Sequence, residues 1–319
     1  MLRNKVVLII PYFGKKPDFF NLWLKSAEAN PDYTFFIYTD LDLPIFEKSN
    51  VKIKRITFMQ LKEKICTLFG SKISLKTPYK LCDYKPAYGL IFKDDIVEFD
   101  FWGFCDVDLI FGKLSHFITD EILDNNEKIF YHGHFSLFKN NEIMNNLFLT
   151  SYKGVCDFET ASSTNYCCHF DESGTVAYAG QNKIVNMYFD WLFYDIPYNR
   201  YSFITLGSTE ENVLYWDQGT LFRINKQKDC SEIMYAHLQK RLMDGWDNFS
   251  DSVCRFGVFR TEFFECKNLE TVYGRLNSPI DLDKQTAFYK RVKRIRRNMI
   301  ITNLLSGAIN YRIKKLIKR

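Results

Sequence analysis

Apolar positions along this chain follow two alternating patterns, continuous runs and helical spacings. Continuous runs are typical of strands buried on both faces, whereas apolar residues that recur every three or four positions indicate amphipathic helices. The strand-like runs are residues 5–11, 34–38, 51–57, 99–112 and 129–138, and the helix-like segments are residues 19–29, 58–69 and 81–92. Because strands and helices alternate, we expect an α/β domain with βαβ units and a mostly parallel sheet.

Two short apolar runs further along the chain, residues 213–216 and 220–223, flank Asp217-Gln218-Gly219. This pattern predicts a β-hairpin in which Asp217 is a turn residue. The loop after the first strand, residues 11–14, lacks a Gly-x-Gly-x-x-Gly fingerprint, which disfavours a dinucleotide-binding Rossmann site. Ligands of open α/β sheets bind at the carboxyl ends of strands, so this loop is still a candidate binding segment.

The run over residues 99–112 contains two carboxylates two positions apart, Asp106 and Asp108. A strand directs alternate side chains to one face, so both carboxylates can converge on one hard cation where the strand gives way to a turn. Two other Asp-x-Asp triplets in the chain are framed by a loop or by a basic segment instead of an apolar strand. Carboxylates against a core are costly without a partner, which favours a metal site here; an exposed strand end with solvated carboxylates is the alternative.

The composition is that of a packed globular protein with reduced thiols. Hydrophobic residues make up 46% of the 319 residues and aromatic residues 17%. The nine cysteines are odd in number and form no Cys-x-x-Cys pair, which argues against a disulfide framework and predicts a cytosolic protein. The first apolar run is too short for a signal peptide, and no apolar run reaches the ~18 residues that would predict a membrane span.

Positive charge is concentrated in the last thirty residues. Of the 43 basic residues, eleven lie in residues 290–319, which contain no acidic residue, so the remainder of the chain has 32 basic against 38 acidic residues. Val292, Ile295 and Met299 recur at helical spacing beside these cations, which predicts helices lying on an anionic membrane surface. Binding of nucleic acid is the rival for this segment alone, but the acidic remainder and the absence of a nucleic-acid motif argue against it.

Two further segments carry residues suited to a phosphate or metal site. Lys80 and Asp83, with Tyr84 and Ala87, are three and four residues apart, the spacing of one helix face, and the basic Lys85 lies in the same segment. A solvated helix end with a weak surface ion pair is the alternative. His237 and Lys240 are three residues apart, so an imidazole could complete a divalent-metal site while the ammonium neutralises a phosphate; a half-exposed His in a basic helix is the alternative.

The pair His132 and His134 is a poor zinc signature because no Cys and no third His accompany it. One of the two either lines a sugar pocket or is an ordinary strand histidine. The polar cluster 171–174 lies between the two candidate segments, and its Asp171 and Glu172 are candidates for an acceptor side. A surface loop with ordinary turn chemistry is the alternative for this cluster.

In these segments the chain resembles metal-dependent, retaining glycosyltransferases of the GT-A kind. It is similar to the glycogenin-type and lipopolysaccharide galactosyltransferases and to the glycosyltransferases with a DXD sugar-binding region. Residues 80–108 resemble that region's helix with Ser-Asp and a basic residue, followed by a strand ending in Asp-x-Asp. In this comparison Asp83 corresponds to the Asp of the family's Ser-Asp pair, and Lys85 lies near the position of the family's basic residue. The Gly-Gly that usually precedes the Asp-x-Asp strand is absent.

The segment 237–240 resembles the C-terminal His-x-x-Gly-x-x-Lys element of those enzymes. Here Lys240 is three residues from His237 instead of six, and no Gly intervenes. The resemblance covers roughly residues 1–245 in the order of its elements and suggests a divergent branch that builds bacterial surface polysaccharide. It implies a GT-A catalytic domain over residues 1–245, with a single Rossmann-like nucleotide-sugar-binding sheet, a connecting segment over 246–289 and a basic amphipathic helical tail over 290–319.

The resemblance also implies an activity and a set of site residues. The protein would move a hexose, with retention, from a nucleotide-sugar, preferably a UDP-sugar, to a polysaccharide or lipid-linked acceptor. Mn²⁺ or Mg²⁺ held by Asp106, Asp108 and His237 would bridge the diphosphate. Asp171 and Glu172 are the implied catalytic candidates. The implied donor-binding residues are Pro11, Tyr12, Phe13, Gly14, Asp40, Lys80, Asp83, Lys85, Asp106, His134 and Lys240.

Two other readings stay open at this point. A nucleotidyltransferase would share the sheet and the metal carboxylates, but it would usually need a glycine-rich phosphate loop near the first strand, where only Gly14 stands. A non-catalytic protein that interacts with a membrane surface would keep the tail without using the acidic residues. The expected location is the inner face of the cell membrane, with peripheral attachment through residues 290–319.

Overall fold

A seven-stranded sheet forms the centre of the N-terminal part of the protein. The computed structural model describes residues 2–43, 49–250, 253–309, 311 and 313. The strands of this sheet lie in the order β3 (Val51–Arg55), β2 (Tyr33–Thr39), β1 (Val6–Pro11), β4 (Phe101–Cys105), β7 (Phe135–Lys139), β6 (Lys128–His132) and β8 (Met187–Tyr188). The pairs β2/β3, β1/β2, β1/β4 and β6/β8 are parallel, while β7 runs antiparallel to both β4 and β6. The expected α/β fold with a mixed, largely parallel sheet is confirmed.

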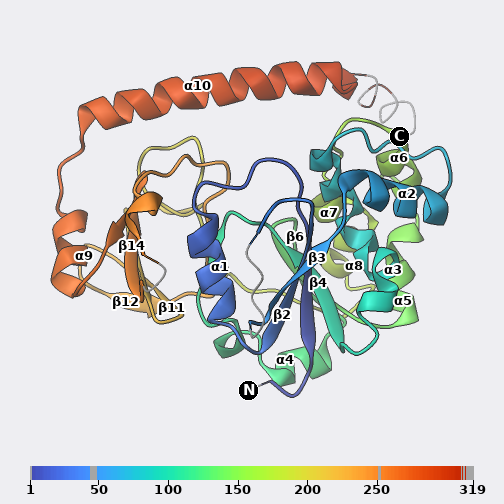
Figure 1. The fold of residues 1–319 in the computed structure, drawn as a ribbon, viewed down its shortest axis with the longest axis horizontal. Coiled ribbons are helices and arrows are strands. Elements are labelled where there is room, and N and C mark those ends of the chain that lie inside the picture. The colour runs from blue at the N-terminus through green and yellow to red at the C-terminus, as the bar shows by residue number, and fades with distance from the viewer. Residues whose placement is uncertain (1, 44–48, 251–252, 310, 312, 314–319) are drawn as a thin grey trace.

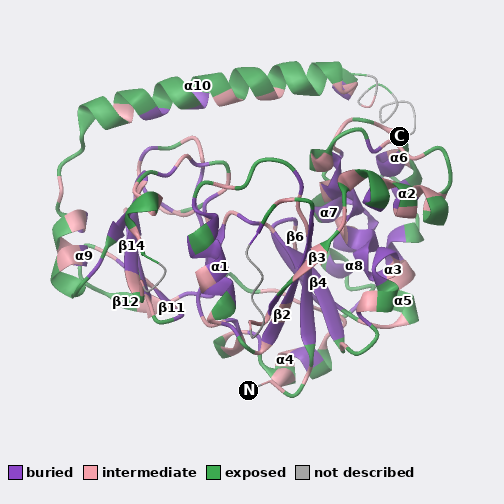
Figure 2. Ribbon diagram, viewed as in Figure 1, coloured by how far each residue is buried: buried purple, intermediate pink, exposed green. Residues whose placement is uncertain are grey.

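Helices cover both faces of this sheet (Figure 1), and alternate residues of the central strands β1, β2 and β4 enter two separate cores. In β1, Val7 and Ile9 pack on one face, toward α2 (Phe58–Phe69), α3 (Tyr88–Ile91), α5 (Glu142–Asn146) and α8 (Thr175–Gln181). Val6 and Leu8 pack on the other face, toward α1 (Phe20–Glu28) and α4 (Asp120–Asn125). Burial on both faces explains why these strands read as continuous apolar runs, and Figure 2 shows them as buried.

The order of the strands creates a point where the chain switches direction across the sheet. From β1 the next two strands, β2 and β3, are added on one side, and β4 is added on the other. The crevice outside the carboxyl ends of such strands is where open α/β sheets bind ligands.

The helix predicted over residues 58–69 has the same bounds in the structure, and Thr57 with Gln60 forms a capping box at its start.

Two predicted elements differ in the structure for reasons visible in the sequence. Residues 81–92, expected as one helix, form a 3₁₀ helix, η1 (Pro78–Ala87), followed by the short α3, because Pro86 cannot donate a helical hydrogen bond. The single strand expected over 129–138 is a hairpin, β6 and β7, whose turn lies at Gly133 and His134. The chain therefore turns back at residues 133–134, and β7 pairs antiparallel with both β6 and β4.

A second, five-stranded antiparallel sheet lies beside the first. Its order is β12 (Cys230–Glu232), β11 (Thr220–Ile224), β10 (Val213–Asp217), β14 (Arg255–Phe259) and β15 (Glu262–Glu265). The predicted hairpin is confirmed as β10 and β11, but Asp217, expected as a turn residue, is the last residue of β10 and pairs with Thr220, so the turn consists of Gln218 and Gly219. The region 246–289, expected as a connecting segment, instead supplies β14, β15 and α9 (Leu269–Leu276) to this unit and to its core.

A small third sheet joins the two halves of the chain. β13 (Tyr235–His237) pairs antiparallel with β5 (Leu109–Phe111) and parallel with β9 (Tyr194–Asp195). Since β5 directly follows the Asp106–Asp108 turn, this sheet brings residues near position 237 to the end of β4.

The basic tail forms one long helix that starts earlier than expected. Helix α10 (Leu282–Leu305) begins at the Asp281 side chain, which accepts the backbone N–H groups of Asp283 and Lys284. Phe288 and Val292 pack with Tyr201, and most of the helix is exposed along one side of the molecule (Figures 1 and 2). Residues 310, 312 and 314–319 of the tail lie outside the described residues. Among the described residues, none of the helices is both long and apolar enough to cross a membrane.

Candidate metal and nucleotide site

A cavity of about 690 Å³ lies outside the carboxyl ends of β1 and β4, a volume typical of small-molecule sites. The residue types that line it are mixed: aromatic side chains from the β1 loop, carboxylates after β4, and cations from η1 and from the segment after β13. Of the residues predicted for the site, those that line it are Pro11, Tyr12, Phe13, Lys85, Asp106, Asp108, His134, Asp171, Glu172, His237 and Lys240.

Asp106 and Asp108 lie in the turn between β4 and β5. Three hydrogen bonds join the backbone of this turn to segments that are distant in sequence. The indole Nε1–H of Trp23 donates to the Asp106 carbonyl at 3.1 Å. The Asp106 N–H donates to the His134 carbonyl at 2.9 Å, and the Leu238 N–H donates to the Asp108 carbonyl at 3.0 Å. Elements distant in sequence therefore hold the two carboxylates at the edge of the cavity.

His237 completes the predicted cluster from the opposite half of the chain. It is paired with Leu109 in the β13–β5 ladder, and its Nε2 lies 3.6 Å from Oδ1 of Asp108. One ligand atom each from Asp106, Asp108 and His237 lie within 4.8 Å of one another. Two ligands of a single divalent ion, each about 2.1 Å from it, lie within about 4.2 Å of each other, so small side-chain rotations suffice to bind one ion.

Asp195, which the sequence analysis did not identify, positions the His237 imidazole. β9 pairs with β13 so that Asp195 is opposite His237, and Oδ1 of Asp195 lies 2.9 Å from His237 Nδ1 and 2.9 Å from Gln239 Nε2. Because a carboxylate accepts hydrogen bonds, we assign the imidazole proton to Nδ1, which leaves the Nε2 lone pair directed at Asp108. A carboxylate behind a histidine in this way is the usual outer partner of a metal-ligating imidazole.

The electrostatics of the cluster fit a hard divalent cation. Burial raises the pKa of Asp108 to about 6, and its Oδ1 is a buried atom without a hydrogen-bond partner among the described residues. Burial by itself lowers the pKa of His237, but the hydrogen bond to Asp195 and the charge of Asp108 outweigh burial and raise it. A buried carboxylate oxygen without a donor is costly unless a cation or a proton meets it.

Lys85 links the metal cluster to the Asp171 carboxylate. Its Nζ donates to Oδ1 of Asp106 at 2.6 Å and to the Gly133 carbonyl at 2.6 Å, and it lies 3.5 Å from Oδ2 of Asp171. Burial raises the pKa of Asp171 to about 7, although the Lys85 charge opposes that rise. Asp171 therefore changes its protonation near neutral pH, as a residue that holds or moves a proton must.

The short helix α7 (Phe170–Ser173) carries Asp171 and Glu172 against η1. Glu172 pairs with His169, whose Nδ1 lies 3.4 Å from Oε1, and this hydrogen bond lowers the pKa of Glu172 and raises that of His169 to about 9. Both carboxylates predicted for the acceptor side thus face the cavity, but only Asp171 is buried.

Lys240 and His134 occupy the rim and the wall of the cavity, respectively. The exposed Lys240 lines the cavity, and its ammonium donates to the Tyr79 hydroxyl at 3.3 Å and lies 5.2 Å from the centre of the Tyr79 ring. His134 is buried, stacks on His237 with ring centroids 4.2 Å apart, and lies 3.0 Å through Nε2 from the Tyr235 hydroxyl. Burial holds the pKa of His134 well below its usual value, so His134 supports His237 as a neutral ring.

Four residues predicted for donor binding do not line the cavity. Lys80 and Asp83 are fully buried: Lys80 Nζ donates to Asp83 Oδ2 at 2.5 Å, and Asp83 also accepts the N–H groups of Cys168 and Phe170 at 2.8 and 2.9 Å. Because these bonds occupy both oxygens, Asp83 anchors the segment that leads to Asp171 and does not offer them to sugar hydroxyls. Asp40, on an exposed bend after β2, and Gly14 also lie outside the lining residues.

The fold and the cluster together define an α/β protein with a candidate divalent-metal centre at the switch point of its sheet. The chain belongs to the DUF6625 family, a family of unknown function, whose model matches residues 8–267. That range includes Asp106, Asp108, Asp195 and His237, and it ends before α10 begins. No curated protein matches the sequence.

Proposed function

We propose that the protein is a metal-dependent glycosyltransferase with a GT-A type catalytic domain. It would transfer a hexose from a nucleotide-sugar, preferably a UDP-sugar, to a polysaccharide or lipid-linked acceptor during bacterial capsule, O-antigen or lipooligosaccharide synthesis. The observation that carries the proposal is the cluster of Asp106, Asp108 and His237 at the switch point, with the buried Asp108 Oδ1 left without a donor among the described residues. The resemblance at residues 80–108 and 237–240 supplies the class of reaction.

The ligand set favours Mn²⁺ over Mg²⁺, because Mg²⁺ takes oxygen ligands almost exclusively whereas an imidazole suits a transition metal. A cation bound by Asp106, Asp108 and His237 supplies Lewis-acid stabilisation of a departing nucleoside diphosphate. Lys240, in the lining of the cavity, would add positive charge against the negative charge that a departing diphosphate develops. Tyr12 and Phe13, which line the cavity after β1, offer aromatic surface on which a nucleotide can pack.

Asp171 is the best-placed group on the acceptor side of the proposed reaction. It is buried, lines the cavity and lies beside Lys85, and its pKa of about 7 lets it hold or release a proton at neutral pH. Glu172, paired with His169, remains ionised and contributes negative charge to the same wall. Retention of the anomeric configuration is proposed on the resemblance alone.

A membrane surface is the proposed location of this reaction, at the cytoplasmic face. In its described part α10 carries six cations between residues 290 and 297, and it exposes apolar side chains one turn further on. The exposed apolar residues are Ile300, Ile301, Leu304 and Leu305. Cations followed by exposed aliphatic side chains favour attachment to anionic lipid. We expect the full chain to sediment with phosphatidylserine-containing vesicles and not with phosphatidylcholine vesicles; equal sedimentation with both would contradict the charge-based attachment.

The transferase proposal is tested by calorimetric titration of UDP and of GDP into the full chain, with Mn²⁺ and with EDTA. The matched variants are Asp108→Asn, in the cluster, and Asp190→Asn, an exposed carboxylate outside the lining residues. We expect one nucleotide to bind only with Mn²⁺, Asp108→Asn to lose that binding, and Asp190→Asn to retain it. Absence of metal-dependent binding for both nucleotides would refute the proposal, as would binding that survives Asp108→Asn.

A further inference from the structure

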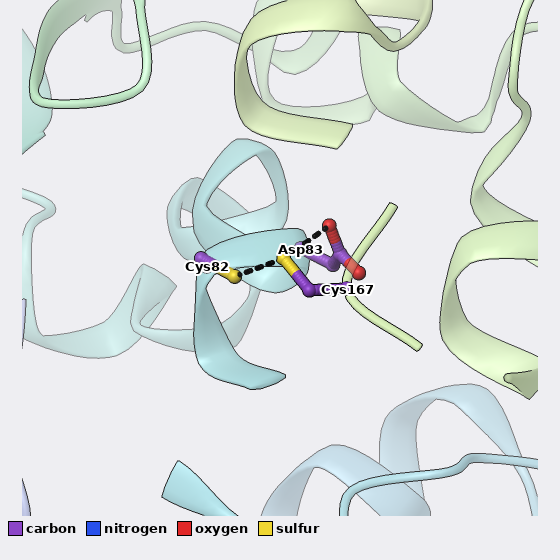
Figure 3. A group of neighbouring side chains, drawn as sticks. All are labelled: Cys82, Asp83 and Cys167. Carbon is purple, nitrogen blue, oxygen red and sulfur yellow. Dashed lines mark hydrogen bonds between the residues drawn. The ribbon is translucent and has the colours of Figure 1, made fainter. Parts of the chain in front are cut away.

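Two thiols meet in the wall of the same cavity. Cys82, on η1, and Cys167, just before α7, place their sulfur atoms 2.9 Å apart (Figure 3). Both side chains are half-buried and both line the cavity, so small molecules can reach them. The proposed transferase chemistry uses neither of them. Residues 85 apart in sequence are thus paired at a point where two cavity-forming segments touch.

Cys82, Cys167 and Asp83 together form a group with the spacing of metal ligands, but the surroundings argue against a metal there. The Asp83 carboxylate already accepts hydrogen bonds from the Lys80 ammonium and from two backbone N–H groups. The Lys80 ammonium, 2.5 Å from Asp83, supplies the positive charge that a cation would otherwise bring. Two thiols alone fall short of the four ligands of a structural zinc site.

We propose that Cys82 and Cys167 are an oxidation site that forms a reversible disulfide when the protein meets hydrogen peroxide. In the first step the Cys167 thiolate attacks the peroxide oxygen, which gives a sulfenic acid and releases water after protonation of the leaving hydroxide. In the second step the Cys82 sulfur attacks that sulfenic sulfur, which forms the S–S bond and releases a second water. Each disulfide formed consumes one molecule of hydrogen peroxide and the hydrogens of two thiols, and it yields two waters.

The two thiols are unequal in the way that this sequence of steps needs. The contact with Cys82 is the largest cause that lowers the pKa of Cys167, and the charge of His169 and its backbone N–H act in the same direction. Burial and the Asp83 carboxylate, whose Oδ1 lies 3.8 Å from Cys167 Sγ, act against them. The contact with Cys167 and burial raise the pKa of Cys82. Thiolates next to donors and cations are the reactive ones, so the neighbouring His169 makes Cys167 the attacking residue and Cys82 the resolving one.

The disulfide would fasten the segment that carries Asp171 to the helix that carries Lys85. A disulfide bond is about 2.05 Å long, so the sulfur atoms need to approach by only about 0.9 Å from their present separation. Cys82 lies three residues before Lys85, and Cys167 lies four residues before Asp171. Oxidation therefore links the two segments that form the Lys85–Asp171 contact of 3.5 Å, next to the metal cluster.

The test begins with the reduced full chain, treated with an equimolar amount of hydrogen peroxide, alkylated and digested without reductant for mass spectrometry. We expect a cross-linked peptide pair that contains Cys82 and Cys167, two fewer free thiols per chain, and full reversal by dithiothreitol. Cys230→Ser, at an exposed thiol, is the matched control and is expected to form the same cross-link. Cys82→Ser is expected to leave a sulfenic acid on Cys167 that dimedone traps.

The unmodified chain decides the result even if a variant fails to fold. A cross-link between Cys156 and Cys168, which form the neighbouring thiol pair, would overturn the proposal. So would oxidation confined to the exposed Cys230 and Cys254, or one tightly bound zinc per chain that protects Cys82 and Cys167 from alkylation. Titration of Mn²⁺ is a separate measurement on separate residues, so failure of the metal cluster leaves this outcome unaffected.

Discussion

Replacement of Asp195 by Asn tests whether a cation is bound through a positioned imidazole. Asp195 is the common acceptor for His237 Nδ1 and Gln239 Nε2, both 2.9 Å from its Oδ1. Asn keeps the size of the side chain but removes the charge that makes His237 a better ligand and fixes its tautomer. We therefore expect the variant to fold normally and to bind Mn²⁺ more weakly.

The expected magnitude follows from the contacts that are lost. Loss of an outer carboxylate from a metal-ligating histidine typically costs 10- to 100-fold in metal affinity, which corresponds to about 1.4 to 2.8 kcal/mol. Gln239→Ala removes one donor to Asp195 and leaves the His237 contact intact, so its effect should fall below tenfold. Asp195 also raises the pKa of His237, so a proton competes with the metal in the wild type, and the comparison belongs near pH 8.

The assay is calorimetric titration of Mn²⁺ alone into the full chain and the variants. Asp190→Asn, an exposed carboxylate on the same stretch of chain, is the control for a general loss of charge. Circular dichroism with thermal unfolding checks that each variant is folded. Wild-type affinity in Asp195→Asn, with the affinity lost in Asp108→Asn, would show that the imidazole needs no outer partner and would refute the positioning role.

Two further predictions concern buried charges. Lys80→Met leaves the buried Asp83 carboxylate without its cation, so we expect the free energy of unfolding by urea to fall by about 3 to 5 kcal/mol. Lys15→Met, at the exposed Lys15–Asp18 pair, should lower it by less than about 1 kcal/mol. Similar losses in both variants would contradict this prediction. Burial raises the pKa of Asp171 to about 7, so the folded state binds more protons than the unfolded state between about pH 4 and 7, and stability falls as pH rises through that window. In Asp171→Asn the loss of unfolding free energy across that window should be smaller by up to about 4 kcal/mol. A variant whose unfolding free energy falls with pH as steeply as that of the wild type would refute the assignment.

The sequence predicted those elements whose signal is local. Buried strands such as β1 and amphipathic helices such as α1 appear in the sequence because burial on a face repeats along the segment itself. The pair Asp106 and Asp108 was identifiable for the same reason, since both residues end one apolar strand. His237 was a candidate through its spacing to Lys240 and through its resemblance to a known element, and the structure brings it to that pair.

Residues whose partners lie far away in the chain could not be predicted in this way. Asp195 meets His237 because β9 and β13 pair in one register, and no spacing in the sequence encodes that pairing. Lys80 and Asp83 could equally form a surface ion pair; they are buried because Ala161 and Tyr166, about eighty residues later, accept further bonds from Lys80 and close over the pair.

The antiparallel pairing of β5 with β13 gives the proposed metal centre a second consequence. Asp108 and His237 are separated by about 130 residues, so an ion that both of them hold closes one of the longest loops in the chain. Closing a loop of that length in an unfolded chain costs about 4 kcal/mol in conformational entropy. In the folded protein the pairing of β5 with β13 has already closed this loop before an ion binds. A nascent chain has its two carboxylates long before its imidazole is synthesised. Metal loading would therefore mark the docking of β13 onto β5, and the protein would become competent only after residues well into its second half have been synthesised.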